Sequence, residues 1–301
     1  MGRAVKVLGG VMLTAVVIGV VAVAIALFVA ERKLDRVIHL DVQAVPYAGG
    51  EAVMLRGQYL FDSRGCAHCH GADGNGKVMA DGHGGMYIKT PNLTMGADGA
   101  ASRYREVDWV RTIRQGVKPD GHPLRIMPAE TFNRLTDADL AAIVAYVRSL
   151  PPGDGGGAEI RLPLIFKVLY GLGIIKDAAQ RIDHGLPPSV LVPMAPTVEY
   201  GRYVANMCMG CHGPGLSGGK IPDGPPDWPA AANLTPGAGS VMPRYASLAL
   251  FKAMLRSGRR PDGSKLSEVM PFDSLAVLSD NDVEAVFAFL KALPPRAAGQ
   301  R

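Results

Sequence analysis

The four cysteines of this chain fall into two motifs of the form Cys-x-x-Cys-His. The first is Cys66-Ala67-His68-Cys69-His70 and the second is Cys208-Met209-Gly210-Cys211-His212. This spacing lets two thiols add to the two vinyl groups of one haem, while the imidazole of the next residue binds the iron from the proximal side. Because the motifs use every cysteine, the sequence predicts two covalently attached haem c groups and leaves no thiol for a disulfide.

Paired cysteines have two other common uses. A thiol redox site normally lies at a helix start in a βαβ context and does not need the following histidine. A zinc site could use both pairs, but the pairs stand in different halves of the chain, one beginning at Cys66 and the other at Cys208. The pairs of a zinc ribbon are usually separated by only about 15–20 residues. The histidine and the long separation therefore favour haem.

The sixth iron ligand decides whether a haem can react. A haem held by its proximal histidine alone keeps an open coordination site, whereas a methionine sulfur closes that site and raises the reduction potential. Met127 follows His70 and Met270 follows His212 at almost the same separation, each in a Met-Pro pair. We predict Met127 and Met270 as the distal ligands. The alternative candidates are His122, His83 and Met242.

The chain contains an internal repeat with a nearly constant offset, which indicates two related units. Besides the motifs and the Met-Pro pairs, the matching segments are Asn92-Leu93-Thr94 with Asn233-Leu234-Thr235, Pro119-Asp120-Gly121 with Pro261-Asp262-Gly263, and Leu150-Pro151-Pro152 with Leu293-Pro294-Pro295. Met242 has no counterpart in this register, which favours Met270 over it.

Each unit is predicted to close with an amphipathic helix that ends at a proline. Thr136 and Ser279 are the expected N-caps, with Asp139 and Asp282 three positions further on in the capping-box position.

Each unit also opens with a short helical segment that contains one glycine, Gly57 or Gly201. Such a glycine either lets the opening and closing helices approach closely or is an ordinary tolerated glycine. The sequence leaves both interpretations open.

Residues 7–30 are 24 uncharged, apolar positions, about 36 Å long as a helix. This length spans a bilayer, and it exceeds the roughly 7–15 residues of a signal-peptide core. An uncleaved signal anchor is therefore expected, and a cleaved signal peptide is the competing interpretation. Arg3 and Lys6 on one flank and Arg32, Lys33 and Arg36 on the other make the positive-inside count indecisive.

The formal charge of +5 does not indicate a nucleic-acid partner, because neither unit is basic. Lys and Arg number 12 against 11 Asp and Glu in residues 50–152, and 9 against 9 in residues 199–295. The excess of positive charge lies at the two ends of the chain.

We therefore expect an all-α fold: an N-terminal transmembrane helix followed by two tandem haem domains. The expected boundaries are 1–49 for the anchor and its linker, 50–152 for the first domain, 153–198 for an interdomain linker, and 199–301 for the second domain and a short tail. Within the linker, residues 153–157 are glycine-rich and expected to be flexible, and the apolar run 160–182 is expected to pack on a domain or to lie at the membrane surface.

Each unit resembles a class I cytochrome c, with Cys-x-x-Cys-His after an opening helix, a distal Met-Pro pair and a closing helix. The tandem arrangement behind an anchor resembles the membrane-bound dihaem cytochromes that serve periplasmic dehydrogenases or feed terminal oxidases. Since haem c is attached after export in such proteins, the resemblance implies domains on the periplasmic side of the bacterial cytoplasmic membrane.

The resemblance further implies an electron carrier that is not itself an enzyme. The donor would be a periplasmic dehydrogenase or a quinol-oxidising complex, and the acceptor a terminal oxidase or a soluble cytochrome. A dihaem cytochrome c peroxidase is the alternative, and it requires one haem that opens a site to peroxide. The matching Met-Pro pairs argue against it.

Overall fold

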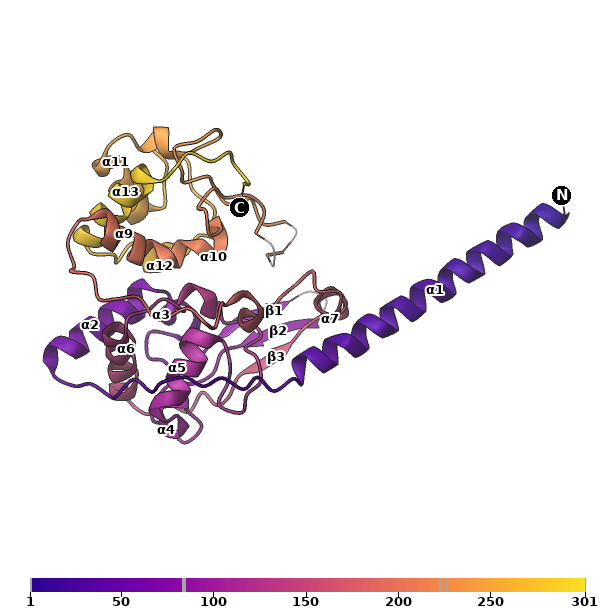
Figure 1. The fold of residues 1–301 in the computed structure, drawn as a ribbon, viewed down its shortest axis with the longest axis horizontal. Helices are drawn as coiled ribbons and strands as arrows, with labels where there is room; N and C mark the ends of the chain where they lie inside the picture. The colour runs from indigo at the N-terminus through magenta and orange to yellow at the C-terminus, as the bar shows by residue number, and fades with distance from the viewer. Residues whose placement is uncertain (1, 83–84, 222–223, 226, 301) are drawn as a thin grey trace.

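The computed structural model describes residues 2–82, 85–221, 224–225 and 227–300. Helix α1 (Gly2–Leu34) projects from the body of the molecule, and two helical units lie one above the other (Figure 1). The helices of the first unit are α2 (Glu51–Ser63), α3 (Cys66–His70), α4 (Ala100–Arg103), α5 (Glu106–Gln115), η2 (Ala129–Thr131) and α6 (Asp137–Ser149). Those of the second are α9 (Val198–Val204), η3 (Ala205–Cys208), α10 (Met209–His212), η4 (Met242–Tyr245), α11 (Leu248–Ser257), α12 (Phe272–Leu275) and α13 (Asp280–Ala292). The two repeat units predicted from the sequence are thus present as two helical units.

The central contact of each unit is a crossing of its opening and closing helices, α2 with α6 and α9 with α13. A Cβ at Gly57 would lie 2.0 Å from the carbonyl oxygen of Ala142 in α6. A Cβ at Gly201 would lie 1.9 Å from the carbonyl oxygen of Ala285 in α13. Both glycines therefore permit backbone-to-backbone approach, and the interpretation of them as ordinary tolerated glycines is wrong.

The closing helices begin and end as predicted. Helix α6 has Thr136 as its N-cap, whose hydroxyl accepts from the backbone N–H of Asp139, and Ser279 accepts from that of Asp282 at the start of α13. Each helix stops directly before a Leu-Pro-Pro segment, because proline lacks the N–H that would continue the helix.

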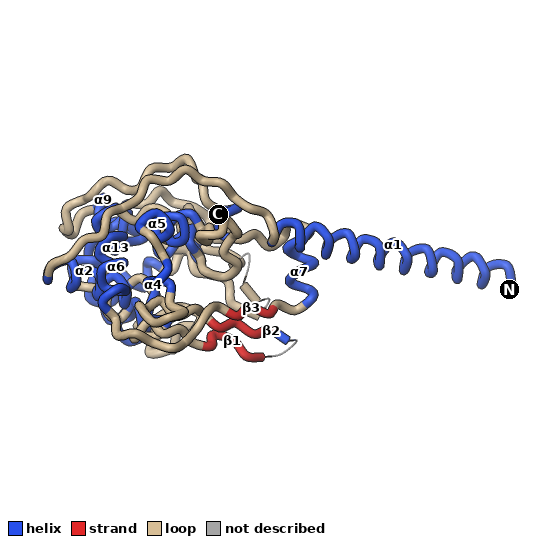
Figure 2. Tube along the Cα trace, turned by 90° about the horizontal axis from the view of Figure 1, so that it is seen from below, coloured by secondary structure: helices blue, strands red, loops and turns tan. Residues whose placement is uncertain are grey.

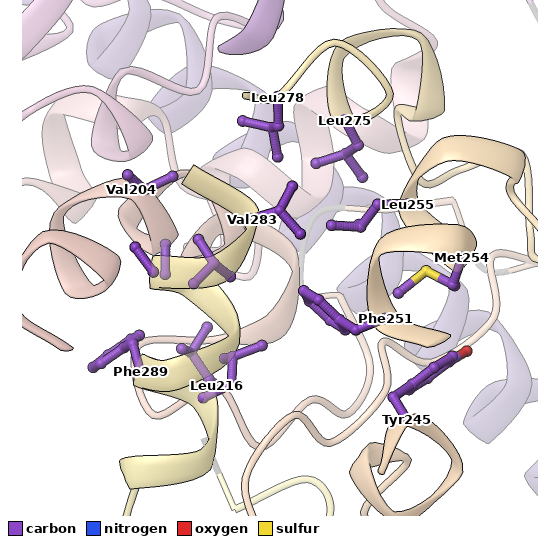
Figure 3. Close-up of a cluster of buried hydrophobic side chains, with 14 of the residues drawn as sticks. Val204, Leu216, Tyr245, Phe251, Met254, Leu255, Leu275, Leu278, Val283 and Phe289 are labelled. Carbon is purple, nitrogen blue, oxygen red and sulfur yellow. The ribbon is translucent and has the colours of Figure 1, made fainter. Parts of the chain in front are cut away.

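The apolar core of the second unit lies between α9, α11 and α13. Figure 3 shows Phe251, Met254 and Leu255 from α11 together with Val283 and Phe289 from α13, all of them buried. The first unit has a corresponding cluster built on α2, α5 and α6. The helical fold class is confirmed.

A small antiparallel sheet adds to the helical architecture and was not predicted. Its order is β1 (Val78–Gly82), β2 (Met86–Lys89) and β3 (Glu159–Arg161), and it lies beside α7 (Leu164–Gly171) (Figure 2). Strand β3 belongs to the linker and pairs with β2, so this part of the linker packs against the first unit. Strands this short carry too little alternation to be recognised in a sequence.

The linker is packed along much of its length. Gly153 donates its N–H to Thr94 Oγ1 at 2.9 Å and accepts from Asn92 Nδ2, while Gly155 donates to Asn75 Oδ1. The glycine-rich stretch is therefore held by hydrogen bonds, and the expectation that it is flexible is wrong. Gly153 and Gly155 are needed for space, since a Cβ at Gly153 would lie 2.3 Å from Asn75 Oδ1 and a Cβ at Gly155 would lie 1.7 Å from the Asn75 carbonyl oxygen.

We expect Gly57→Ala and Gly201→Ala each to destabilise their unit by about 1–3 kcal/mol or more, because the new methyl group overlaps a backbone carbonyl that cannot move without separating two helices. Thermal unfolding of the haem-loaded protein, followed by circular dichroism, measures this loss.

Gly49→Ala is the matched control, because no heavy atom lies within 4 Å of a Cβ at that position. Unchanged unfolding of both helix variants would show that the crossings relax without cost.

Candidate functional site

The two Cys-x-x-Cys-His segments occupy equivalent places in the two units. The first forms α3 itself, and the second runs from the end of η3 through α10. Gly71 and Gly213 follow the two motifs with φ of 82° and 80°, a conformation that glycine adopts without strain, and so end each turn directly after the histidine. None of the four cysteines is in a disulfide, and all four are half-buried.

The Nδ1 atom of each motif histidine makes a hydrogen bond that orients the ring. His70 Nδ1 lies 3.2 Å from the carbonyl oxygen of Pro91, and His212 Nδ1 lies 2.8 Å from that of Ala232. A carbonyl accepts only, so Nδ1 carries the proton and Nε2 keeps the lone pair that an iron ligand needs. Burial lowers the pKa of His70, although the bond to Pro91 opposes this shift, which favours the neutral imidazole.

The two accepting carbonyls are held by the repeated Asn-Leu-Thr segments that follow them. Asn92 and Thr94 are fully buried and bond to Gly153, on the chain just after α6. Asn233 and Thr235 bond in the same way to Arg296, after α13. The Asn-Leu-Thr repeat is therefore a clamp between the histidine-orienting loop and the end of the closing helix.

The surroundings of the thiols do not suit a thiol redox site. Burial raises the pKa of Cys66 and of Cys208 to about 12, whereas thiol redox chemistry uses the thiolate. Within the described residues no group of three or more His, Cys, Asp or Glu side chains could hold a metal ion. Neutral, half-buried thiols beside an oriented imidazole fit covalent haem attachment.

A buried donor without a partner also fits a bound group in the first unit. The indole Nε1–H of Trp109 is buried and has no hydrogen-bond acceptor among the described residues. Trp109 belongs to the apolar cluster against which Cys66 packs. Since a buried N–H is normally satisfied, this donor is available to a polar group of the cofactor.

The predicted distal methionines lie in equivalent loops. Met127 and Met270 are both half-buried, and each Met-Pro pair leads directly into a short helix, η2 or α12. Met270 packs against the same apolar cluster as Cys208.

A repeated ion pair frames each of these loops. Arg114 Nη1 lies 2.7 Å from Asp137 Oδ1, and Arg256 Nη2 lies 3.0 Å from Asp280 Oδ1. The arginine stands near the end of the helix before the loop, and the aspartate is the first residue of the closing helix. Each ion pair therefore joins the two ends of the chain segment that carries the methionine.

The alternative ligand candidates lie in other settings. Met242 is 8% exposed and is part of the buried apolar core of the second unit. His122 lies in the turn after α5 with its Nδ1 3.1 Å from Asp120 Oδ1. His83 is outside the described residues. The assignment of Met127 and Met270 as ligands stays a prediction.

A reciprocal pair of hydrogen bonds joins the two units. Tyr59 in α2 donates to Asp282 Oδ2 in α13 at 2.7 Å, and Tyr203, near the end of α9, donates to Asp139 Oδ2 in α6 at 2.6 Å. The tyrosine hydroxyls also accept from the backbone N–H groups of Ser279 and Thr136. The opening helix of each unit therefore contacts the start of the other unit's closing helix. We call these four side chains, Tyr59, Asp282, Tyr203 and Asp139, the tyrosine–aspartate clasp.

Both carboxylates of the clasp are buried and paired with a cation. Asp139 receives two bonds of 2.8 Å from Arg56, and Asp282 receives a bond of 2.9 Å from the buried Arg64. Burial opposes ionisation of Asp282, but the charge of Arg64 and the hydrogen bonds outweigh it and lower the pKa of that carboxyl group. Burial and the charge of Asp139 raise the pKa of Tyr203 to about 12.

The same interface brings each haem motif to the other unit. Helix α3 contacts α12, and α10 contacts η2, so each motif lies against the short helix that follows the other unit's Met-Pro pair. Asn206, just before the second motif, donates to the carbonyl oxygen of Thr131 at 2.7 Å. In Figure 1, α9, α10 and α12 line the side of the second unit that faces α2 and α3.

The clasp was not predicted from the sequence. Asp139 and Asp282 were expected to serve in capping boxes, but the Asp139 carboxylate binds Arg56 and Tyr203, and the Asp282 carboxylate binds Arg64 and Tyr59. The internal repeat could have indicated these residues. The two aspartates occupy equivalent positions in it, and each tyrosine lies two positions after the glycine of its opening helix, Gly57 or Gly201.

Each half of the chain matches a family model. Residues 54–151 match the family described as Cytochrome c, and residues 199–290 match that described as Cytochrome C oxidase, cbb3-type, subunit III.

The chain is also similar, over most of its own length, to several curated proteins. It is 27% identical to the fructose dehydrogenase cytochrome subunit of Gluconobacter japonicus over 85% of this chain and 55% of that protein. It is 26% identical to a diheme cytochrome c-type protein of Cereibacter sphaeroides over 87% of this chain and 92% of that protein. It is 25% identical to the cytochrome c subunit of the quinone alcohol dehydrogenase of Gluconobacter oxydans over 83% of this chain and 56% of that protein. The chain thus spans little more than half the length of the dehydrogenase subunits.

We expect Tyr203→Phe to weaken the docking of the two units by about 1.5–3 kcal/mol, because it removes a bond to a charged acceptor and leaves Asp139 to Arg56 alone. The contribution of the Tyr203 hydroxyl is complete below about pH 10, the usual pKa of tyrosine. This contribution decreases as the pH rises from about 10 to about 12, because in this range the unfolded chain releases the proton and the folded chain keeps it until its own pKa of about 12. Denaturant unfolding at several pH values measures the difference between wild type and variant.

Tyr87→Phe in β2 is the control, because the Tyr87 ring stacks with Arg161 of β3 and is not part of the tyrosine–aspartate clasp. A wild-type advantage over Tyr203→Phe that stays constant up to pH 12 would contradict the assigned role of the hydroxyl.

Proposed function

Because this protein is a dihaem c-type cytochrome, we propose that it carries single electrons between two redox proteins and catalyses no reaction of its own. The observation that carries the proposal is the symmetry of its two sites: the same motif, the same histidine-orienting bond and the same Met-Pro loop occur in both units. A peroxidase instead requires one haem that opens a site to peroxide.

The cofactor-binding residues follow from the motifs. Cys66 and Cys69 would hold one haem c and Cys208 and Cys211 the other, with His70 and His212 as proximal and Met127 and Met270 as distal ligands. Each bound haem would supply an iron that alternates between the ferric and ferrous states. The protein's part is to fix the imidazoles through Pro91 and Ala232 and to keep the Met-Pro loops rigid, so that the ligands need not rearrange when the charge changes.

The interface between the units supports use of the two sites in series. The motif of each unit lies against the other unit, and the tyrosine–aspartate clasp fixes that arrangement with buried, paired charges. A carrier that accepts an electron in one domain and releases it from the other requires a fixed, close placement of the two domains. We propose residues 50–152 and 199–301 as those domains.

Helix α1 supports membrane attachment. Its residues Val5–Leu34 are long and apolar enough to cross a membrane, and most of them are exposed. We propose that it anchors the protein by a single span in the bacterial cytoplasmic membrane, with both haem domains in the periplasm.

The similarity to cytochrome subunits of dehydrogenases supports a partner of that kind as electron donor. A quinol-oxidising complex is the alternative donor, and the acceptor would be a terminal oxidase or a soluble cytochrome. No nucleic-acid partner is proposed, because Lys and Arg barely outnumber Asp and Glu in residues 50–152, 12 against 11, and equal them in residues 199–295, 9 against 9.

Spectropotentiometric titration of the detergent-extracted protein tests this function. We expect two low-spin haems that do not react with peroxide, and we expect Met127→Ala and Met270→Ala each to remove the methionine–iron charge-transfer band of one haem and lower its potential. Loss of the sulfur ligand opens the site, so each variant should also gain reactivity with peroxide.

Met95→Ala is the control, because that side chain is 40% exposed and belongs to neither Met-Pro pair. A high-spin or peroxide-reactive haem in the wild type would refute the carrier and favour the peroxidase. Loss of the band in Met242→Ala but not in Met270→Ala would refute the distal ligand of the second domain.

A further inference from the structure

The linker segment 164–174 packs against the apolar helix α1. A Cβ at Gly171 would lie 1.9 Å from the carbonyl oxygen of Ala26, so α7 and α1 touch backbone to backbone. Ala26 and Ala30 are buried at this contact. Figures 1 and 2 both show α7 beside the end of α1 that joins the body of the molecule.

The contact lies within the apolar length of α1. The uncharged run of α1 ends at Ala30, and Ala26 is one helical turn, about 6 Å, inside that end. If α1 spans the bilayer as proposed above, Gly171 is at the depth of the outermost part of the hydrocarbon. The residues next to it on α7 are then at the same depth.

The outer face of this segment is apolar and uncovered. Leu164, Ile165, Leu172 and Ile174 are each 59–61% exposed, about as much as the side chains of α1 itself. Charged groups are placed on the side toward the end of α1, where Lys167 pairs with Glu31 at 2.8 Å and Arg36 pairs with Asp177. This division between an apolar and a charged side is typical of a helix at a membrane surface.

The last four backbone carbonyl oxygens of α7 all accept hydrogen bonds from protein groups. The carbonyl oxygens of Val168 and Leu169 accept from the N–H groups of Leu172 and Ile174. Those of Tyr170 and Gly171 both accept from Lys33 Nζ at 3.1 Å. Because hydrocarbon offers no hydrogen bonds, a helix end can lie in it only when its carbonyls are paired internally, as these are.

The same segment continues into contact with the Met127 loop. Ala178 and Ile182, in and after α8 (Ala178–Arg181), form a buried apolar cluster with Ala129, two positions after Met127. Arg181 pairs with Glu130 at 3.2 Å. A shift of α7 relative to the membrane would therefore move the loop of the first domain.

We propose that residues 164–174 are a second lipid-contacting element, seated in the periplasmic leaflet beside α1, and that through α8 they hold the Met127 loop of the first domain at the membrane surface. The inference rests on the proposed membrane anchor. It makes the first haem site the one nearer the lipid and the second the more distant one.

Fluorescence quenching by lipid tests the proposal in the haem-loaded, full-length protein reconstituted into nanodiscs. Single cysteines at Ile165→Cys and Ile174→Cys are labelled with a thiol-reactive fluorophore and compared in phospholipid with and without brominated acyl chains. The comparison between two lipids cancels the constant quenching by haem. We expect emission to fall by about twofold in brominated lipid, as for a probe at the boundary of headgroups and acyl chains.

Two labelled positions serve as controls. Val17→Cys in α1 is the positive control, and Val190→Cys, 83% exposed in a linker segment that contacts the first unit near Arg134, is the negative control. Quenching at Val17 but not at Ile165 or Ile174 would overturn the lipid-contacting element and leave the anchor intact. Absence of quenching at Val17 would overturn the proposed anchor itself and, with it, this inference.

Gly171→Val tests the packing that seats the segment. Its side chain would overlap the Ala26 carbonyl and separate α7 from α1, so quenching at Ile165 should be lost while that at Val17 persists. Gly157→Val, where a Cβ has no neighbour within 4 Å, is the matched control. Unchanged quenching at Ile165 in Gly171→Val would show that α7 is not held by α1.

Discussion

The arrangement of the two domains depends on two buried carboxylates. Asp139 and Asp282 stand at the same position of their closing helices, and neither could be buried as a charge without a cation and hydrogen-bond donors. Arg56 and Tyr203 satisfy the first, and Arg64, Tyr59 and Tyr200 satisfy the second. Tyr203 of the second domain binds Asp139 of the first, and Tyr59 and Arg64 of the first domain bind Asp282 of the second. Separation of the domains would therefore remove hydrogen-bond partners from both carboxylates.

Duplication produced this interface without making its halves identical. The two tyrosine–aspartate bonds are equivalent, but the residue two positions before each haem motif differs. The first domain has Arg64 there, which pairs with Asp282, and the second has Asn206, which bonds to a carbonyl. Equivalent geometry is therefore combined with unequal charge near the two motifs. A repeated fold can in this way give two sites the same ligands and different surroundings.

The linker is a structural part of the protein. It supplies β3 to the sheet, Gly153 to the Asn-Leu-Thr clamp, α7 to the contact with α1 and α8 to the cluster under the Met127 loop. Its interruptions by glycine and proline separate these short elements. A segment with the composition of a flexible connection thus joins the apolar helix, the first domain and one candidate ligand loop.

The sequence by itself determined the cofactor chemistry, the repeat, the helical fold class and the caps of the closing helices, because these depend on residue types at short spacing. It could not decide whether Gly57 and Gly201 are contact points, since that depends on where Ala142 and Ala285 lie in space. The partners of the Asp139 and Asp282 carboxylates could not be predicted either, since they too depend on which residues lie nearby in space. A local cap and a partner from the other domain compete for one side chain, and only the folded chain shows that the distant partner wins. Local spacing fixes local chemistry, whereas burial and long-range contacts are properties of the tertiary structure.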